Sequence, residues 1–295
     1  MLKTEKSMIE KTCLVTGANT GIGYAISLGL AKMGATVIMV CRNKPRGEAA
    51  MTELKKKSGN NSISLFIADL SSQTSIRQLV TDFKTKFGKL DILINNAAVI
   101  TQNRTLTEDG LETQFALNHL APFLLTELLL DSLKTSDSAR IINISSNAHQ
   151  TVNINFDDLQ SEQSYKPKEV YQRTKLCNLL FTYELARQLN GTHITANCVH
   201  PGVITTKLLR AYNGGKRDFN FISKLFYSTP EKGAETSLYL ASSSKLEGIS
   251  GKYFDNKKIV NSSKYSNDLT VAKKLWQISQ SLTMQERVTT KNKPH

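Results

Sequence analysis

The stretch YQRTK, Tyr171 to Lys175, places a phenol four residues before an ammonium group. The same spacing begins at Tyr212 and Tyr253, so spacing alone does not identify a reactive pair. Two helix-breaking glycines follow soon after Tyr212, and Tyr253 lies in the strand-like GKYFDN. Tyr171 instead opens the helical-period stretch VYQRTKLCNLLFTYELARQL, in which residues four apart share a face. Of the three pairs, Tyr171 and Lys175 are predicted to interact.

Such a pair can move a proton. A phenol with a pKa of about 10 is protonated at neutral pH, and a neighbouring ammonium stabilises the phenolate that is left after donation. This chemistry fits protonation of a carbonyl oxygen, and in the reverse direction removal of a proton from an alcohol.

A glycine-rich turn supplies the second chemical signal. CLVTGANTGIGYAI runs from an apolar strand through Gly17, Gly21 and Gly23 into a helix. Gly17 permits a sharp turn, the two later glycines let the backbone approach a pyrophosphate, and N–H groups at the helix start favour an anion. The spacing differs from Gly-x-Gly-x-x-Gly, yet its strand and helix context predicts a dinucleotide site.

The end of the second expected strand indicates which dinucleotide binds. It reads Val40, Cys41, Arg42, Asn43, Lys44, with no carboxylate before Glu48 to bind the ribose 2′-hydroxyl of NAD. The planar guanidinium of Arg42 suits the 2′-phosphate of NADP. NADP is therefore the predicted cofactor, with a basic residue on a solvated loop as the alternative.

Short β-branched runs alternate with helical-period stretches along the chain. The expected strands are TCLVTG, ATVIMVC, ISLFIAD, LDILINNA, ARIINISS, HITANCVHPG and GKYFDN. The pattern predicts an α/β fold with a doubly wound parallel sheet (Rossmann-type), about seven strands and helices on both faces. A single domain is expected over residues 1–295, with flexible tails at about 1–10 and 284–295.

Composition narrows the class further. The four cysteines are far apart and are expected to be buried thiols, and the five histidines form no metal-binding spacing, so no metal is predicted. No stretch is long and apolar enough to span a bilayer.

The formal charge of +13 is concentrated after residue 203, with sixteen Lys/Arg against seven Asp/Glu. This excess lacks interleaved aromatics, so no nucleic acid is expected as a partner.

Together these motifs resemble the short-chain dehydrogenase/reductase family over nearly the whole chain. The resemblance implies a catalytic tetrad of Asn118, Ser146, Tyr171 and Lys175, in the stretches ALNHLAPF, INISS and YQRTK. It implies hydride transfer to a carbonyl carbon while Tyr171 protonates the oxygen, Ser146 orients that oxygen, Lys175 binds ribose hydroxyls and Asn118 holds a water. The residues expected at the cofactor are Thr16, Gly17, Asn19, Thr20, Gly21, Ile22, Gly23, Arg42, Asp69, Leu70, Asn96, Ala97, Tyr171, Lys175, Pro201, Gly202, Val203 and Thr206.

Within that family the chain looks most like retinol-dehydrogenase-like members, through CRN, INISSNAH, FDDLQSE and VHPGV, and it shares some features with protochlorophyllide reductases. The membrane anchor that those retinoid enzymes often carry is not expected in this chain. The protein is expected to be a cytoplasmic homo-oligomer. Residues 203–229 are expected to close over an apolar aldehyde, ketone or alcohol. An ordinary amphipathic helix, or basic residues that meet an anionic membrane surface, are the alternatives for this segment. The alternative functions are a catalytically weak dinucleotide-binding redox sensor and a protochlorophyllide-reductase-like enzyme.

Overall fold

The computed structural model describes residues 8–204, 207–212 and 228–284. The strands of this part of the chain form one sheet in the order β3-β2-β1-β4-β5-β6-β7-β8. Their bounds are β1 Thr12–Thr16, β2 Thr36–Cys41, β3 Ile63–Ile67, β4 Ile92–Asn95, β5 Ala139–Ile144, β6 Ile194–His200, β7 Tyr253–Asp255 and β8 Lys258–Ile259.

The seven strands predicted from the sequence are all present, and every pairing among these seven is parallel. The eighth, β8, is an addition that runs antiparallel to β7. It contains two exposed residues, too few to show any periodicity in the sequence. The predicted Rossmann-type fold class is confirmed.

Helices connect the parallel strands. Their bounds are α1 Gly21–Lys32, α2 Lys44–Ser58, α3 Gln73–Lys86, α4 Thr113–Phe115, α5 Ala121–Lys134, α6 Pro167–Gln188, α7 Lys207–Tyr212, α9 Pro230–Ser242 and α10 Leu269–Thr283. A π-helical turn, η1 Ala116–Leu120, joins α4 to α5, and 3-10 turns lie at η2 Asn147–Thr151, η3 Phe156–Asp158, η4 Ser244–Leu246 and η5 Lys264–Asn267.

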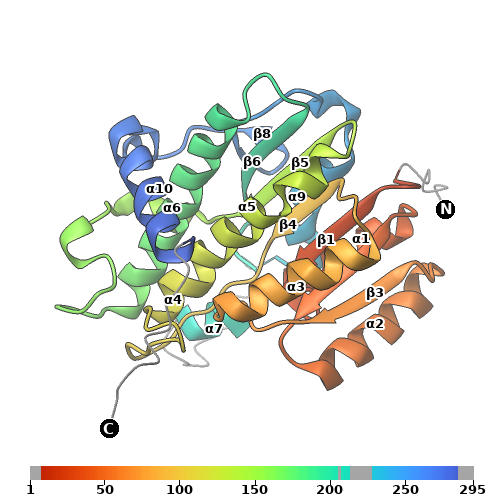
Figure 1. The fold of residues 1–295 in the computed structure, drawn as a ribbon, viewed down its shortest axis with the longest axis horizontal. Coiled ribbons are helices and arrows are strands. Elements are labelled where there is room, and N and C mark those ends of the chain that lie inside the picture. The colour runs from red at the N-terminus through yellow and green to blue at the C-terminus, as the bar shows by residue number, and fades with distance from the viewer. Residues whose placement is uncertain (1–7, 205–206, 213–227, 285–295) are drawn as a thin grey trace, which may run out of the picture.

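The helices cover the two faces of the sheet in two layers (Figure 1). Alternate strand residues such as Leu14 and Ile141 pack with α3, α5, α6 and Trp276 of α10 on one face. Their neighbours, such as Val15 and Ile142, pack with α1, α2 and α9 on the other. Burial on both faces explains why these strands are almost continuously apolar.

The strand order reverses between β1 and β4, because the chain from β1 builds outward to β3 and then returns to β4. At such a reversal the connections leave toward opposite faces and open a crevice at the carboxyl ends of the strands. Thr16, Asn95 and Ile144 are the last residues of β1, β4 and β5. The residues predicted to do chemistry follow these strand ends.

Several smaller expectations concern the rest of the chain. Met8, within the predicted N-terminal tail, is buried, and its N–H donates to the Met33 carbonyl at 3.0 Å. All four cysteines are free and buried, as predicted. Within the described ranges no helix has the length and apolarity needed to cross a membrane, and no three His, Cys, Asp or Glu side chains gather as a metal site would require.

Candidate active site

The glycine turn after β1 is packed too tightly for any side chain. Gly17 has φ +66°, and a Cβ on Gly23 would lie 2.3 Å from the Gly17 carbonyl oxygen and 2.5 Å from Nδ2 of Asn96. Only glycine avoids both the left-handed strain at residue 17 and the backbone clash at residue 23. The first turn of α1 therefore lies directly against the end of β1.

Thr16 and Asn96 join this turn to the end of β4. The Thr16 hydroxyl accepts N–H groups from Asn96 at 2.9 Å and Ala97 at 3.0 Å. The Asn96 amide donates to the Thr16 carbonyl at 2.8 Å. These bonds bring three predicted cofactor residues together, although Thr16 is 80 residues away from Asn96 in the sequence.

Arg42 and Asp69, at the ends of β2 and β3, form an ion pair with 3.4 Å between Nη1 and Oδ2. Both side chains are exposed, by 72% and 37%, so solvent weakens the ion pair and either side chain can bind another group in its place. Ser71 donates its N–H and its hydroxyl to the other Asp69 oxygen, and these bonds, opposing partial burial, lower the pKa of Asp69. Two of the predicted cofactor residues thus lie side by side.

A cavity of about 420 Å³ opens between the start of α1 and the first half of α2. Its lining residues are Asn19, Thr20, Gly21, Tyr24, Arg46, Ala49, Ala50 and Glu53. Arg46 is a basic residue that the sequence analysis missed. The Asn43 side chain accepts the Arg46 N–H at 3.0 Å and caps the start of α2. Arg46 therefore lies in the first turn of this helix, where it lines the cavity. The signal available in the sequence was Asn-Lys-Pro-Arg, a helix start carrying a second arginine.

Ser146 and Tyr171 meet beside the end of β5. Burial raises the pKa of Tyr171 above its ordinary value and the neighbouring Tyr212 adds to the rise, while a hydrogen bond with Ser146 opposes it. The Ser146 hydroxyl oxygen accepts the Ala148 N–H at 3.2 Å, so its own hydrogen can be donated to an oxygen beside Tyr171. Tyr171 is therefore protonated at neutral pH, in the form that donates a proton.

Lys175 lies one turn further along α6, with its Nζ 5.5 Å from the centre of the Tyr171 ring. The side chain is 2% exposed, and Nζ donates to the Ile144 carbonyl at 2.9 Å. Burial lowers its pKa to about 8. Ser145 donates its hydroxyl to the Lys175 carbonyl at 2.8 Å, so the end of β5 and this turn of α6 are bonded to each other twice.

Asn118 is wholly buried in the π-helical turn. Its side chain accepts the Val99 N–H at 2.8 Å and donates to the Val99 carbonyl at 3.0 Å and to the Thr174 hydroxyl at 3.2 Å. The amide thus joins the loop after β4 to the turn of α6 between Tyr171 and Lys175. Its predicted role as a water holder stays a prediction, because these three contacts use the side chain itself.

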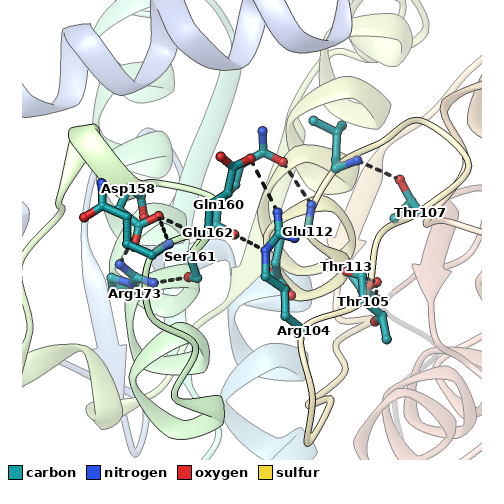
Figure 2. A network of polar contacts seen from close by, with 12 residues as sticks. Arg104, Thr105, Thr107, Glu112, Thr113, Asp158, Gln160, Ser161, Glu162 and Arg173 are labelled. Carbon is teal, nitrogen blue, oxygen red and sulfur yellow. Dashed lines mark hydrogen bonds and ion pairs between the residues drawn. The ribbon is translucent and has the colours of Figure 1, made fainter.

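A polar network holds the approaches to α4 and α6 together (Figure 2). Arg104 donates to the Gln160 carbonyl at 3.0 Å, and the Gln160 side chain accepts the Glu112 N–H at 3.0 Å. Glu112 is fully buried and caps α4 through two N–H groups. Arg173, between Tyr171 and Lys175 in sequence, donates to the Ser161 hydroxyl. These bonds fix the position of the loop before Asn118 relative to α6, the helix that contains Tyr171.

A row of amides crosses the middle of the sheet. Asn95 donates to the Asn143 side chain at 2.8 Å, and Asn143 donates to Thr182 of α6 at 2.9 Å. The row fixes α6 over the ends of β4 and β5.

The segment after β6 is described only in part. Pro201, Gly202 and Val203 follow β6, and Gly202 has φ +85°. Thr206, and residues 213–227 of the predicted substrate segment, lie outside the described residues. At the end of α7, the ring of Tyr212 packs edge-on against Tyr171 with centroids 5.6 Å apart, a neighbour that the sequence analysis did not anticipate.

The doubly wound sheet, with a glycine turn at its switch point and a buried tyrosine–lysine pair beside it, is the arrangement of a Rossmann-type oxidoreductase. The chain belongs to the short-chain dehydrogenase family, whose sequence model, described as short chain dehydrogenase, matches residues 11–216. It is 44% identical to human retinol dehydrogenase 14 over 286 residues, covering 92% of this chain and 85% of that protein. It is 38% identical to human polyprenol dehydrogenase over 281 residues, covering 93% and 85%.

A solved structure agrees with this assignment. A crystal structure of an uncharacterized protein from Mycobacterium paratuberculosis has 32% identity and a TM-score of 0.77, covering 94% of this chain and 95% of that one. The predicted membership of the family, and the resemblance to retinol dehydrogenases, are confirmed.

Proposed function

We propose that the protein is an NADP-dependent oxidoreductase that interconverts an apolar aldehyde or ketone and the matching alcohol. The observation that carries this proposal is the meeting of Ser146, Tyr171 and Lys175 at the end of β5, beside the glycine turn. A hydroxyl donor, a protonated phenol and a buried amine there supply what carbonyl reduction needs from a protein.

In the reductive direction, the nicotinamide supplies the hydride when the cofactor is bound. Ser146 donates its hydroxyl hydrogen to the substrate oxygen and holds that oxygen beside Tyr171. Tyr171 gives its proton to that oxygen, and the positive charge of Lys175 stabilises the phenolate that remains. In the oxidative direction the phenolate takes the alcohol proton.

The residues present fit a dinucleotide. At Gly23 a Cβ would collide with backbone, so the start of α1 lies as close to β1 as a pyrophosphate-binding turn needs. Arg42 and the cavity containing Arg46 offer two guanidinium groups on one side of this turn, with no carboxylate at the end of β2. Two guanidiniums favour a 2′-phosphate over a 2′-hydroxyl.

Catalytic efficiency with NADPH is expected to exceed that with NADH by about tenfold or more, or about 1.4 kcal/mol. Arg42→Asp should shrink or reverse the difference, because a carboxylate repels the 2′-phosphate and accepts a hydrogen bond from a 2′-hydroxyl. Steady-state kinetics with both cofactors measures this. Lys56→Asp, the same charge change at an exposed position near the other end of α2, should leave the ratio unchanged. Equal efficiencies of the wild-type enzyme with both cofactors would contradict the assignment.

The substrate class draws on the named relatives and on Tyr212. Retinol and polyprenol are the substrates in the names of the two human relatives, and both are long apolar alcohols. In this chain the Tyr212 ring lies against Tyr171, with its hydroxyl accepting from Gln172 at 3.3 Å. An aromatic wall beside the proton donor favours an apolar substrate.

Efficiency is expected to rise with apolar length when a short polar aldehyde is compared with a long-chain or aromatic aldehyde of similar intrinsic reactivity. Tyr212→Ala should flatten this rise, because it removes the apolar wall. Tyr212→Phe keeps the ring and should preserve the rise. The measurement is kcat/KM across the aldehyde series. A wild-type preference for the short polar aldehyde would refute the substrate class.

A further inference from the structure

His149 is a fully buried histidine that the proposed reaction does not use. It lies in η2, the turn that follows Ser146, and both of its ring nitrogens are hydrogen-bonded. Nδ1 lies 2.7 Å from the Ser146 carbonyl oxygen, and Nε2 lies 3.1 Å from the backbone nitrogen of Ser263. The ring also packs edge-on against Tyr253, with centroids 5.1 Å apart.

The two backbone partners determine the position of the ring proton. The Ser263 N–H can only donate, so Nε2 must accept and carry no hydrogen. The Ser146 carbonyl can only accept, so Nδ1 must carry the hydrogen and donate it. Burial lowers the pKa of His149, against the opposing effect of the bond to Ser146, which keeps the ring neutral and in this single tautomer.

The contact joins two distant parts of the chain. Ser263 is the N-cap of η5, and its hydroxyl accepts the Ser266 N–H at 3.4 Å. The adjoining Ser262 is bonded to Tyr183 of α6 at 2.7 Å. The turn after Ser146 is thus tied, through one imidazole, to a segment beyond the residues that the family model matches.

The next residue of the turn is held as well. Asn147 donates its N–H to Nδ1 of His200 at 3.3 Å, and its side chain accepts from the Tyr253 hydroxyl at 2.7 Å. The peptide that follows Ser146 therefore has fixed partners for its carbonyl and its N–H. Its plane sets the direction in which the Ser146 hydroxyl points.

We propose that His149 is a positioning residue, whose Nδ1–H holds the Ser146 carbonyl so that the Ser146 hydroxyl faces the substrate oxygen beside Tyr171. The inference rests on the proposed function, because it assumes that Ser146 contacts that oxygen. His149 itself touches neither substrate nor cofactor. Its effect should fall on kcat and leave dinucleotide affinity unchanged.

Two amide variants separate the two bonds of the ring. His149→Asn places an amide N–H near the position of Nδ1 and keeps a donor for the Ser146 carbonyl. His149→Gln places its amide near the position of Nε2, where it can accept the Ser263 N–H, and removes the side-chain donor to Ser146, leaving only the backbone N–H of residue 149, 3.2 Å from the same carbonyl oxygen. We expect kcat to fall by about tenfold in His149→Gln and by much less in His149→Asn. The Kd for NADPH, measured by calorimetry, should stay unchanged in both.

The control is His193→Asn, a change at an exposed histidine, which should leave kcat, Kd and Tm unchanged. Equal losses of kcat in the two His149 variants, accompanied by equal falls in Tm, would show a role in folding alone and overturn the inference. Full kcat in His149→Gln would overturn it as well.

The ring tautomer gives a test that needs no substrate. Nitrogen-15 NMR of the histidine-labelled wild-type protein at pH 7 should show His149 protonated at Nδ1 and bare at Nε2. Protonation at Nε2 would overturn the inference. Failure of the proposed function would be seen separately, as a wild-type protein that neither binds NADPH nor reduces any carbonyl compound, and the tautomer would still be readable.

Discussion

Tyr171→Phe is expected to lower kcat for carbonyl reduction by about a hundredfold to ten-thousandfold, the contribution of a general acid. The variant loses only the hydroxyl, and the ring keeps its packing against Tyr212. Because the raised pKa of Tyr171 keeps it protonated at neutral pH, the wild-type residue is a ready donor that phenylalanine cannot replace. The measurement is kcat with a saturating aldehyde and NADPH.

Binding of NADPH to Tyr171→Phe should be close to that of the wild-type protein, since the glycine turn and Arg42 are unchanged. Tyr239→Phe, on α9, removes a hydroxyl away from Ser146 and Lys175 and should retain full activity. Most of the wild-type activity remaining in Tyr171→Phe, on a confirmed substrate, would require another proton donor and would remove the basis of the proposed mechanism.

Lys175→Met is expected to change activity and stability in opposite directions. Activity should fall by at least about a hundredfold, because the phenolate loses its neighbouring positive charge. Stability at pH 7 should rise by about 1–3 kcal/mol, because a buried charge is replaced by an apolar chain of similar length. The Ile144 carbonyl keeps the Asn178 amide as a donor at 3.3 Å, so it is not left unpaired.

The gain in stability should depend on pH in a defined direction. Lys175 has a folded pKa of about 8, below its ordinary 10.5, so the folded protein binds fewer protons than the unfolded chain between these values. Wild-type stability from this residue is therefore lowest below about pH 8 and rises toward pH 10.5. The advantage of Lys175→Met should narrow over the same interval.

Urea unfolding of both proteins at pH 7 and pH 10 measures the effect. Lys273→Met, an exposed lysine on α10, should change neither stability nor activity. A Lys175→Met variant that is less stable than the wild-type protein at pH 7 would mean that the ammonium stabilises the fold, contrary to the burial argument.

Much of the fold follows from local patterns in the sequence. The seven parallel strands and the helices between them show their own periodicities, and the burial of each strand on both faces makes it apolar enough to recognise. Gly17, Gly21 and Gly23 mark the turn through their spacing and context. Tyr171 and Lys175 are one helical turn apart, so their position on one helical face follows from the five residues YQRTK alone.

Contacts between distant segments were decided by the tertiary structure. Arg46 reaches the cavity beside the glycine turn because α1 and α2 lie next to each other, and nothing in its own stretch fixes that neighbour. Tyr212 lies against Tyr171, a contact that no pattern in its own stretch indicates. The two-residue β8 exists because it pairs with β7.

The hydrogen bond between His149 and Ser263 is the clearest contact that the tertiary structure decided, since 114 residues separate its partners. Residue types and spacing predicted the proton chemistry, the dinucleotide turn and the sheet, because those properties depend on side-chain chemistry and on neighbours within a few residues. The single tautomer of His149 and the lowered pKa of Lys175 depend instead on burial and on backbone groups brought from other elements. Only the packed chain supplies these, because hydrogen bonding and desolvation are set by spatial neighbours.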